Sequence, residues 1–345
     1  MRRLALILGV VLALCNAATL AATDVNRSCD AAADCRVIVK NTAGSVQVRS
    51  WDQNRVELKG TLGEDVTGLE FTGGDKTVTM EVVVPHRHGR RIASTLTVSV
   101  PAGASVEVEA VSADVKVTGV SGEVSAASVS GDVVVEKAAN AVRASSVSGD
   151  VEVSATGPSV TAKTTSGNVN VSGEIGAVQA DSVSGSVDIS GTAQSVSSET
   201  ISGDVTLTGT VAEFKTKTVS GDVSADRTTE KAEASSVSGD IEVKAGPLAA
   251  GAFSTESGDV EYSGDLAESG KLRASARSGS IFVRIPENPA AAFEASTLSG
   301  RIQNAFGPAP EKPVGAGSRL RFGPTGATAQ VSLETMSGDI VLERK

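Results

Sequence analysis

The stretch that decides the fold is Val147-Ser148-Gly149-Asp150-Val151-Glu152-Val153, because close copies of it recur through most of the chain. A Ser-Gly pair, followed in most copies by Asp, returns at intervals of 18 residues and then at slightly longer ones. Such self-similarity is typical of stacked repeats. The 18-residue series comprises Gly131, Gly149, Gly167, Gly185, Gly203, Gly221 and Gly239, and later copies lie at Gly258, Gly279, Gly300 and Gly338.

Apolar and polar residues alternate after each repeated glycine. Val151 and Val153 flank Glu152, and further along the same repeat Val160 and Ala162 flank Thr161. Alternation with period two indicates a strand with one buried face. The pattern therefore predicts two short strands in each repeat, each too short to bury its apolar face without a neighbouring repeat.

We therefore predict an all-β fold, a parallel β-solenoid in the form of a flattened β-helix with about 18 residues and two short strands per coil. Equivalent residues of successive coils then lie about 4.8 Å apart. Aromatic residues make up only 3 % of the chain, which suits a thin core. The repeated glycine predicts a corner that needs positive φ or close backbone approach. The Ser before it is expected to hydrogen-bond the corner backbone.

The N-terminus has the layout of a secretory signal peptide, which we assign to residues 1–22. Arg2 and Arg3 precede an apolar run, and small residues surround a cleavage point after Ala21 or Ala22. The run is too short for a mature membrane anchor, so we expect no membrane span after removal of the signal. The mature protein is expected to be periplasmic or secreted to the cell surface.

The mature chain divides by the regularity of its repeats. Residues 23–112 are expected to form irregular β coils and a cap, residues 113–303 the regular solenoid, and residues 304–345 a loop excursion and capping strands. Ala43–Val48 matches the first strand of a repeat, and Val56–Leu58 is assigned as the second. Irregular coils at both ends would hide unpaired strand edges. Other features of the flanks are two strands, Val78–Val84 and Leu96–Val100, and a surface excursion, Phe306–Ser318.

Charge and cysteine content limit the partners. The formal charge of −10 becomes −12 once Arg2 and Arg3 are removed, which disfavours binding to nucleic acid. Cys29 and Cys35 remain in the mature chain, and in an oxidising compartment we expect them to form a disulfide. No cofactor is expected.

The serial Ser-Gly-Asp-Val repeats, the stretch Leu96–Val106 and the early Trp51 give the chain a family resemblance. From about Val37 to Lys345 it resembles the bacterial putative-adhesin family of β-strand-repeat proteins, which has no assigned biochemical function. The resemblance implies a β-strand-repeat fold and a place in the cell envelope. It implies no catalytic residues.

One acidic column is a candidate calcium site, because stacked carboxylates repel and a divalent cation would offset the repulsion. The chain lacks the double glycines of calcium-binding β-rolls, and Asn168 and Ser186 interrupt the column. We therefore favour solvated turn residues that bond the local backbone. The column consists of Asp132, Asp150, Asp204, Asp222, Asp240 and Asp259.

Other candidate sites are weaker. His86 and His88 are the only histidines and have no Asp or Cys cluster beside them, so we interpret them as loop residues. Glu152 and Asp188 would face outward on nearby coils, but Asn170 separates them, which disfavours a catalytic pair. Thr206 and Thr208 form one Thr-x-Thr pair, and equivalent pairs do not continue into the array that ice binding requires.

The sequence therefore predicts an exported, non-catalytic β-solenoid that serves as an envelope scaffold, adhesion or interaction surface. Its partner is expected to be an envelope protein or a glycan. The alternative is a polysaccharide-active enzyme on a β-helix fold, which the low content of Trp and Tyr disfavours.

Overall fold

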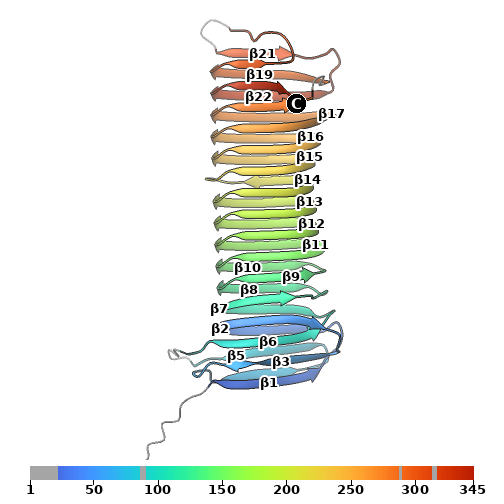
Figure 1. Ribbon diagram of the computed structural model, residues 1–345, viewed down its shortest axis with the longest axis vertical. Helices are drawn as coiled ribbons and strands as arrows, with labels where there is room; N and C mark the ends of the chain where they lie inside the picture. The colour runs from blue at the N-terminus through green and yellow to red at the C-terminus, as the bar shows by residue number, and fades with distance from the viewer. Residues whose placement is uncertain (1–21, 86–90, 287–289, 313–316) are drawn as a thin grey trace, which may run out of the picture.

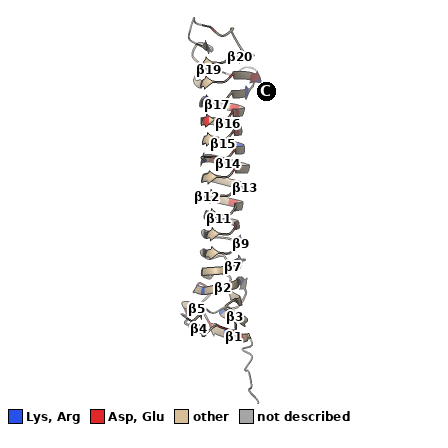
Figure 2. Ribbon diagram, turned by 90° about the vertical axis from the view of Figure 1, so that its left-hand side faces the viewer, with Lys and Arg blue, Asp and Glu red and all other residues tan. Residues whose placement is uncertain are grey.

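The computed structural model describes residues 22–85, 91–286, 290–312 and 317–345. Within these ranges every regular element is a β-strand. The strands stack into a long column that is broad in one view and narrow in the view turned by 90° (Figures 1 and 2). The prediction of an all-β chain built from repeats is confirmed. The predicted signal segment lies outside the described residues except for Ala22.

Parallel strands form the middle of the column, and their register carries the repeat. Val151 pairs with Val169 and Val169 pairs with Val187, so equivalent residues of consecutive coils lie side by side. The regular pairing begins before residue 113, since Val106 already pairs with Val124. The strands are β7 (Ser105–Thr118), β8 (Val124–Ser130), β9 (Val133–Ala138), β10 (Val142–Ser148), β11 (Val151–Ser166), β12 (Val169–Ser184), β13 (Val187–Ser202), β14 (Val205–Lys217), β15 (Val223–Ser238), β16 (Ile241–Ser257), β17 (Val260–Ser278) and β18 (Ile281–Ile285).

Most of these coils are one bent strand rather than the two short strands that we predicted. β11, β12 and β13 each continue for 16 residues around the bend between the two walls. Gly173 and Gly191 lie at this bend with φ of +128° and +112°, a region that glycine enters without steric penalty. They pair with each other across neighbouring coils. The parallel ladder therefore continues through the bend.

The core is a thin double row of small side chains, as expected. Val151 and Val153 on one wall and Val160 and Ala162 on the other are buried, and their polar neighbours point outward. Larger residues are accommodated by small partners on the next coil. Phe214 pairs with Ala232, for example. This alternation of large and small residues fills the core without opening a gap between the walls.

At the N-terminal end the first coil of the chain lies inside the stack. β2 pairs in parallel with β5 and β6 on one side and with β7 on the other. β1 and β3 form an antiparallel ribbon on β6, and β4 is antiparallel to β5. The strands are β1 (Thr23–Asp30), β2 (Arg36–Trp51), β3 (Arg55–Leu62), β4 (Gly68–Gly73), β5 (Thr77–Val83) and β6 (Ser94–Pro101).

These pairings correct one prediction about this end. Ala43–Val48 does follow the first wall of a coil, since Val46 pairs with Val115. Val56–Leu58, however, is not the second wall of that coil. It belongs to β3, which runs antiparallel between β1 and β6. The outermost strand, β1, is mostly exposed and carries charged residues, which protects a free strand edge from pairing with another chain.

At the C-terminal end, too, a coil from the end of the sequence lies inside the stack. β22 pairs with β17 on one side and with β19 on the other, and β23 lies between β18 and β20. β21 runs antiparallel on β19 and forms the outer cap, as Figure 1 shows. The last strands are therefore an internal coil, whereas we predicted that they would cap the stack. The strands are β19 (Ala291–Ser299), β20 (Ile302–Asn304), β21 (Ser318–Phe322), β22 (Ala329–Ser337) and β23 (Ile340–Arg344).

This arrangement predicts an unusual pattern of hydrogen exchange. β22 is paired on both edges although it lies near the end of the sequence, so its amides should exchange at least about tenfold more slowly than those of β21. Exchange followed by mass spectrometry on peptides covering 318–322 and 329–337 measures the difference. Equal exchange of the two peptides would show that β22 behaves as an edge strand and would contradict the insertion.

Candidate functional site

The glycine corner is the most regular feature of the stack, and it is built from backbone contacts. A Cβ atom at Gly149, Gly167 or Gly185 would collide with the glycine carbonyl group of the preceding coil. The amide of Gly167 also donates to the carbonyl oxygen of Ser184 on the next coil, at 3.2 Å. Close backbone approach, one of the two reasons that we expected, therefore explains the repeated glycine.

In most coils a buried hydroxyl joins the corner to the coil before it. The Ser146 hydroxyl donates to the Gly131 carbonyl oxygen at 2.9 Å, and the Thr164 hydroxyl donates to that of Gly149 at 2.9 Å. These residues lie three positions before the glycine of their own coil. The Ser immediately before each glycine, to which we assigned this role, is exposed at Ser148. Alternation explains the difference, because counting inward positions from Val142 and Ala144 leads to Ser146.

The acidic column makes a third contact between coils. Oδ1 of Asp132 accepts the backbone N–H of Asp150 at 2.9 Å, and Oδ1 of Asp150 accepts that of Asn168 at 2.7 Å. Asn168 continues the chain of bonds by accepting the N–H of Ser186. The carboxylates thus bond the backbone, as the favoured interpretation had it, but the donor belongs to the next coil. The described residues contain no group of three or more metal-ligating side chains placed to hold an ion.

Replacing one of these carboxylates tests the structural role. Asp150→Ala should destabilise the protein by about 1 kcal/mol, because the amide of Asn168 loses its acceptor. Asp150→Asn should be nearly neutral, since it keeps Oδ1 and copies the residue that stands naturally at Asn168. Urea unfolding followed by circular dichroism measures both variants. An equal loss in both, reversed by calcium, would instead favour a cation in the column.

Beside the glycine corner runs an exposed apolar row that the sequence reasoning missed. Eight of its side chains are between 40 % and 53 % exposed, and Leu298 is 62 % exposed. The signal was present, since the alternation that places Ser146 inside places Val147 outside. We call these positions, two residues before each corner glycine or its equivalent, the corner row. Its apolar members are Val111, Val129, Val147, Val183, Ile201, Val219, Val237, Leu298 and Met336.

The fold does not require apolar residues in the corner row. Thr165, Glu256 and Arg277 occupy the same position in three coils, and Arg277 and Glu256 form an ion pair at 3.2 Å. Val and Ile suit strands, but so does Thr, which would leave the surface polar. Exposed apolar residues that are aligned over several coils are typical of contact surfaces.

The outer face of the second wall carries a shallow groove of about 520 Å³. Small residues such as Ser159, Ala177 and Ser195 line one part of it. Two ion pairs border the other part, Lys231 with Glu213 at 2.7 Å and Lys215 with Glu233 at 2.9 Å. Each ion pair joins neighbouring coils, so the charges here are satisfied within the protein and the groove offers mainly hydroxyl groups.

The outward face of the first wall offers no pair of neighbouring carboxylates at the positions that we considered. Glu152 pairs with Asn170, and Asn170 pairs with Asp188, so the amide separates the two acids as predicted. Thr206 lies between Asp188 and Ser224, which ends any threonine array. His86 and His88 lie outside the described residues.

Cys29 and Cys35 are present as free thiols, so the expected disulfide is absent from this structure. Burial raises the pKa of both thiols, and the charge of Asp30 adds to the effect on the pKa of Cys29. The charge of Cys29 also raises the pKa of Cys35, which reflects their proximity. Raised pKa values leave little thiolate at neutral pH, and thiolate is the reactive form.

The disulfide therefore stays a prediction with a defined pH dependence. Spontaneous oxidation of the purified, reduced protein should be slow at pH 7 and should accelerate as the pH rises toward the thiol pKa values. Thiol alkylation followed by intact-mass measurement gives the rate. The control is Cys29→Ser, in which Cys35 should stay alkylatable throughout. Full alkylation of both cysteines after prolonged oxidation at high pH would rule the disulfide out.

The fold and its corners define the class of protein: an all-β chain of stacked repeats whose coils share one glycine corner. The chain belongs to the Toastrack DUF4097 family, which matches residues 95–177 and 171–343. The family covers more than half of the sequence. No curated protein matches the chain. Within the described residues no helix is long and apolar enough to cross a membrane.

Several solved structures resemble the chain at low identity. A putative cell adhesion protein from Clostridium sporogenes is 8 % identical, with 94 % of this chain and 100 % of that chain covered and a TM-score of 0.20. A putative adhesin from Parabacteroides distasonis is 12 % identical, with 94 % and 97 % covered and a TM-score of 0.34. A putative lipid binding protein from the same species is 15 % identical, with 75 % and 94 % covered and a TM-score of 0.33. At these TM-scores the similarities support no argument about function.

Proposed function

We propose that the protein is an exported, non-catalytic scaffold of the cell envelope that binds a partner protein along its corner row. The observation that carries the proposal is the exposure of aligned Val and Ile side chains at positions where other coils hold Thr, Glu or Arg. Such a surface has no role inside the stack and lies open to solvent. Burying it against a partner would remove apolar area from water, which is favourable.

A protein partner suits this surface better than a glycan. Sugar-binding surfaces use exposed aromatic rings as stacking platforms. Here Tyr262 is fully buried and Trp51 is half-buried, with its indole N–H donating to the Arg55 carbonyl oxygen at 2.7 Å. The corner row is aliphatic instead, and the repeat gives it the regular spacing of the coils. The enzymatic alternative would need an accessible pair of catalytic groups, and the outward residues discussed above offer ion-paired or isolated charges.

The contacts that recur from coil to coil would then serve rigidity. Each coil of the regular stack is tied to the next by the glycine backbone contact and, in most coils, by the buried hydroxyl and the acidic side chain. A partner would therefore meet a surface that is organised before binding, which lowers the entropy lost on association. This rigidity supports a scaffold role and requires no conformational change.

Substitution of the corner row tests the proposal. Val183→Thr, Ile201→Thr and Val219→Thr together keep β-branched side chains and copy the residue found at Thr165, so the melting temperature should be nearly unchanged. A photo-crosslinking residue at Ile201, used in intact cells, identifies the partner protein. The purified partner should then bind the triple variant at least about tenfold more weakly, equivalent to about 1.4 kcal/mol.

Two controls keep the result interpretable. Ser190→Ala with Thr208→Ala alters the outer face of the first wall in neighbouring coils and should leave binding unchanged. A crosslinker at Asp188 should not capture the same partner. Unchanged affinity of the triple variant would refute the corner row as the binding surface, and turnover of any envelope polysaccharide by the purified protein would refute the non-catalytic role.

A further inference from the structure

A basic pocket of about 440 Å³ lies at the second bend of the stack, on the opposite edge from the glycine corner. Three cationic residues line it, Arg227, Lys244 and Lys345. They come from separate strands or from the residue that follows the last strand, so the fold brings them together across several coils. The hydroxyl-bearing residues of its lining are Thr210, Thr229 and Ser263.

The charge of the side chains that line this pocket is opposite in sign to the net charge of the chain. The protein has a formal charge of −10, yet no acidic side chain is among the residues that line the pocket. The backbone of Gly246 also contributes to the lining. Cationic groups beside hydroxyl donors, with access from solvent, are the chemistry that binds oxyanions.

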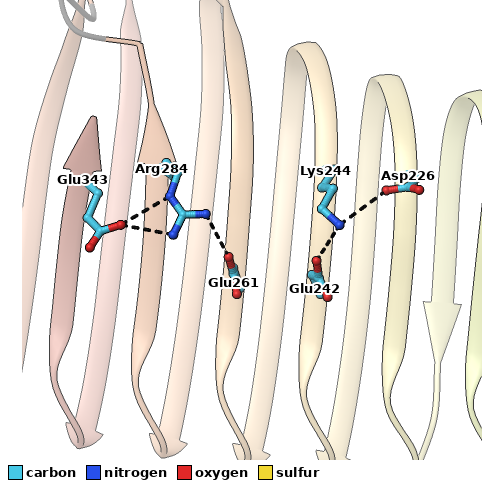
Figure 3. A network of polar contacts seen from close by, with 6 residues as sticks. All are labelled: Asp226, Glu242, Lys244, Glu261, Arg284 and Glu343. Carbon is cyan, nitrogen blue, oxygen red and sulfur yellow. Dashed lines mark hydrogen bonds and ion pairs between the residues drawn. The ribbon is translucent and has the colours of Figure 1, made fainter. Parts of the chain in front are cut away.

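The three cations differ in how far they are already neutralised. Lys244 is held by Glu242 at 2.7 Å and by Asp226 at 3.8 Å, as Figure 3 shows, and the hydrogen bond with Glu242 raises its pKa. Nζ of Lys345 lies 3.8 Å from Oδ1 of Asp265. The side chain of Arg227, in contrast, forms no ion pair or hydrogen bond with another side chain or backbone group in the described part of the chain. Its guanidinium group is therefore the one of the three cations that no carboxylate of the described residues neutralises.

The backbone of Arg227 gives a second, independent observation. Its φ is +57°, a left-handed conformation that is unfavourable for residues with a side chain. The three preceding coils place Gly173, Gly191 and Gly209, all with positive φ, at the same distance after their corner glycines. Arg227 thus stands where the three preceding coils use glycine. Strained backbone of this kind concentrates at functional sites.

The local path of the chain holds this strain in place. Between β14 and β15 the pairing passes from Leu207–Ala225 directly to Val211–Thr228, so β15 is one residue shorter at the bend. Thr228, next to Arg227, is fully buried, which fixes the chain on its C-terminal side. The bulge therefore directs Arg227 to the edge of the stack, where it lines the pocket with Lys244 and Lys345.

We propose that this pocket binds a phosphate group, with Arg227 as the principal ligand and Lys345, Lys244 and the three hydroxyls as supporting donors. A doubly charged oxyanion suits three cations of which two are partly neutralised. The planar guanidinium can donate two parallel hydrogen bonds to such a group. The phosphate would be free, carried by a sugar or carried by a lipid headgroup. The site is separate from the corner row and does not depend on the partner proposed above.

The test uses substitutions that separate binding from folding. Arg227→Gly removes the guanidinium and introduces the residue type of the three preceding coils, so the variant should be at least as stable as the wild type. Its affinity for inorganic phosphate should fall at least tenfold. Arg227→Lys should bind with intermediate affinity, because it keeps the charge and loses the bidentate geometry. Isothermal calorimetry and the phosphate-induced rise in melting temperature, both at constant ionic strength, measure the effect.

Lys137 provides a matched control elsewhere on the stack. It is the other described non-glycine residue with positive φ, at +54°, and it lies outside this pocket. Lys137→Gly removes one charge and one strained residue, and it should leave phosphate binding unchanged. A phosphate effect that is equal in wild type and Arg227→Gly, or absent from the wild type, would overturn the proposal.

The source of the phosphate is resolved by comparing probes. Glucose 6-phosphate should bind more tightly than inorganic phosphate if the group is carried by a sugar. Sedimentation with vesicles containing phosphatidic acid, but not with phosphatidylcholine vesicles, would indicate a lipid. Free phosphate as the tightest binder would indicate the ion itself. In each case Arg227→Gly should remove the preference.

Discussion

The structure depends on the contact between glycine backbones at one corner. Because Gly149, Gly167 and Gly185 have no side chain, each coil can place its peptide group directly against that of the coil before it. This approach lets the glycine amide reach a carbonyl group on the next coil. It also brings the buried hydroxyl and the acidic side chain within bonding distance of the neighbouring backbone. The spacing of the coils, and hence the packing of the thin core, follows from this contact.

Most of this architecture is predictable from the sequence because it is local and repeated. The period specifies which residues stack, and the alternation specifies which face is buried. It is harder to predict from the sequence which hydroxyl bonds the corner carbonyl group. Ser146 looks equivalent to Ser148 in composition, and only a strict count of inward positions from Val142 separates them. The same count places Val147 outward. A count that is shifted by one residue therefore misplaces both the hydroxyl that bonds the glycine carbonyl group and the corner row.

The order of the coils is a different problem, because the repeat motif describes a coil and not its neighbours. The corner at Gly338 has the same residues as the others, yet in space it lies between those of Gly279 and Gly300. Nothing in an identical motif distinguishes an internal coil from a terminal one. The strands that do cap the stack pair antiparallel, β21 at one end and β1 and β3 at the other. A parallel repeat pattern gives no information on antiparallel partners.

The candidate sites differ in how strongly the fold restricts the residue type at each position. At the glycine corner, three backbone-directed contacts leave little choice of residue, and the acidic column there is explained by the bonds that it makes between coils. The second bend is less restricted, since Ala155, Gly173, Arg227 and Ala245 all occupy equivalent positions after their corner glycines. A charged residue can enter that bend at the expense of local strain and leave the stack intact. Recognition chemistry in such a protein therefore belongs where the repeat is broken or where its outward positions are free, which is where both the corner row and the basic pocket lie.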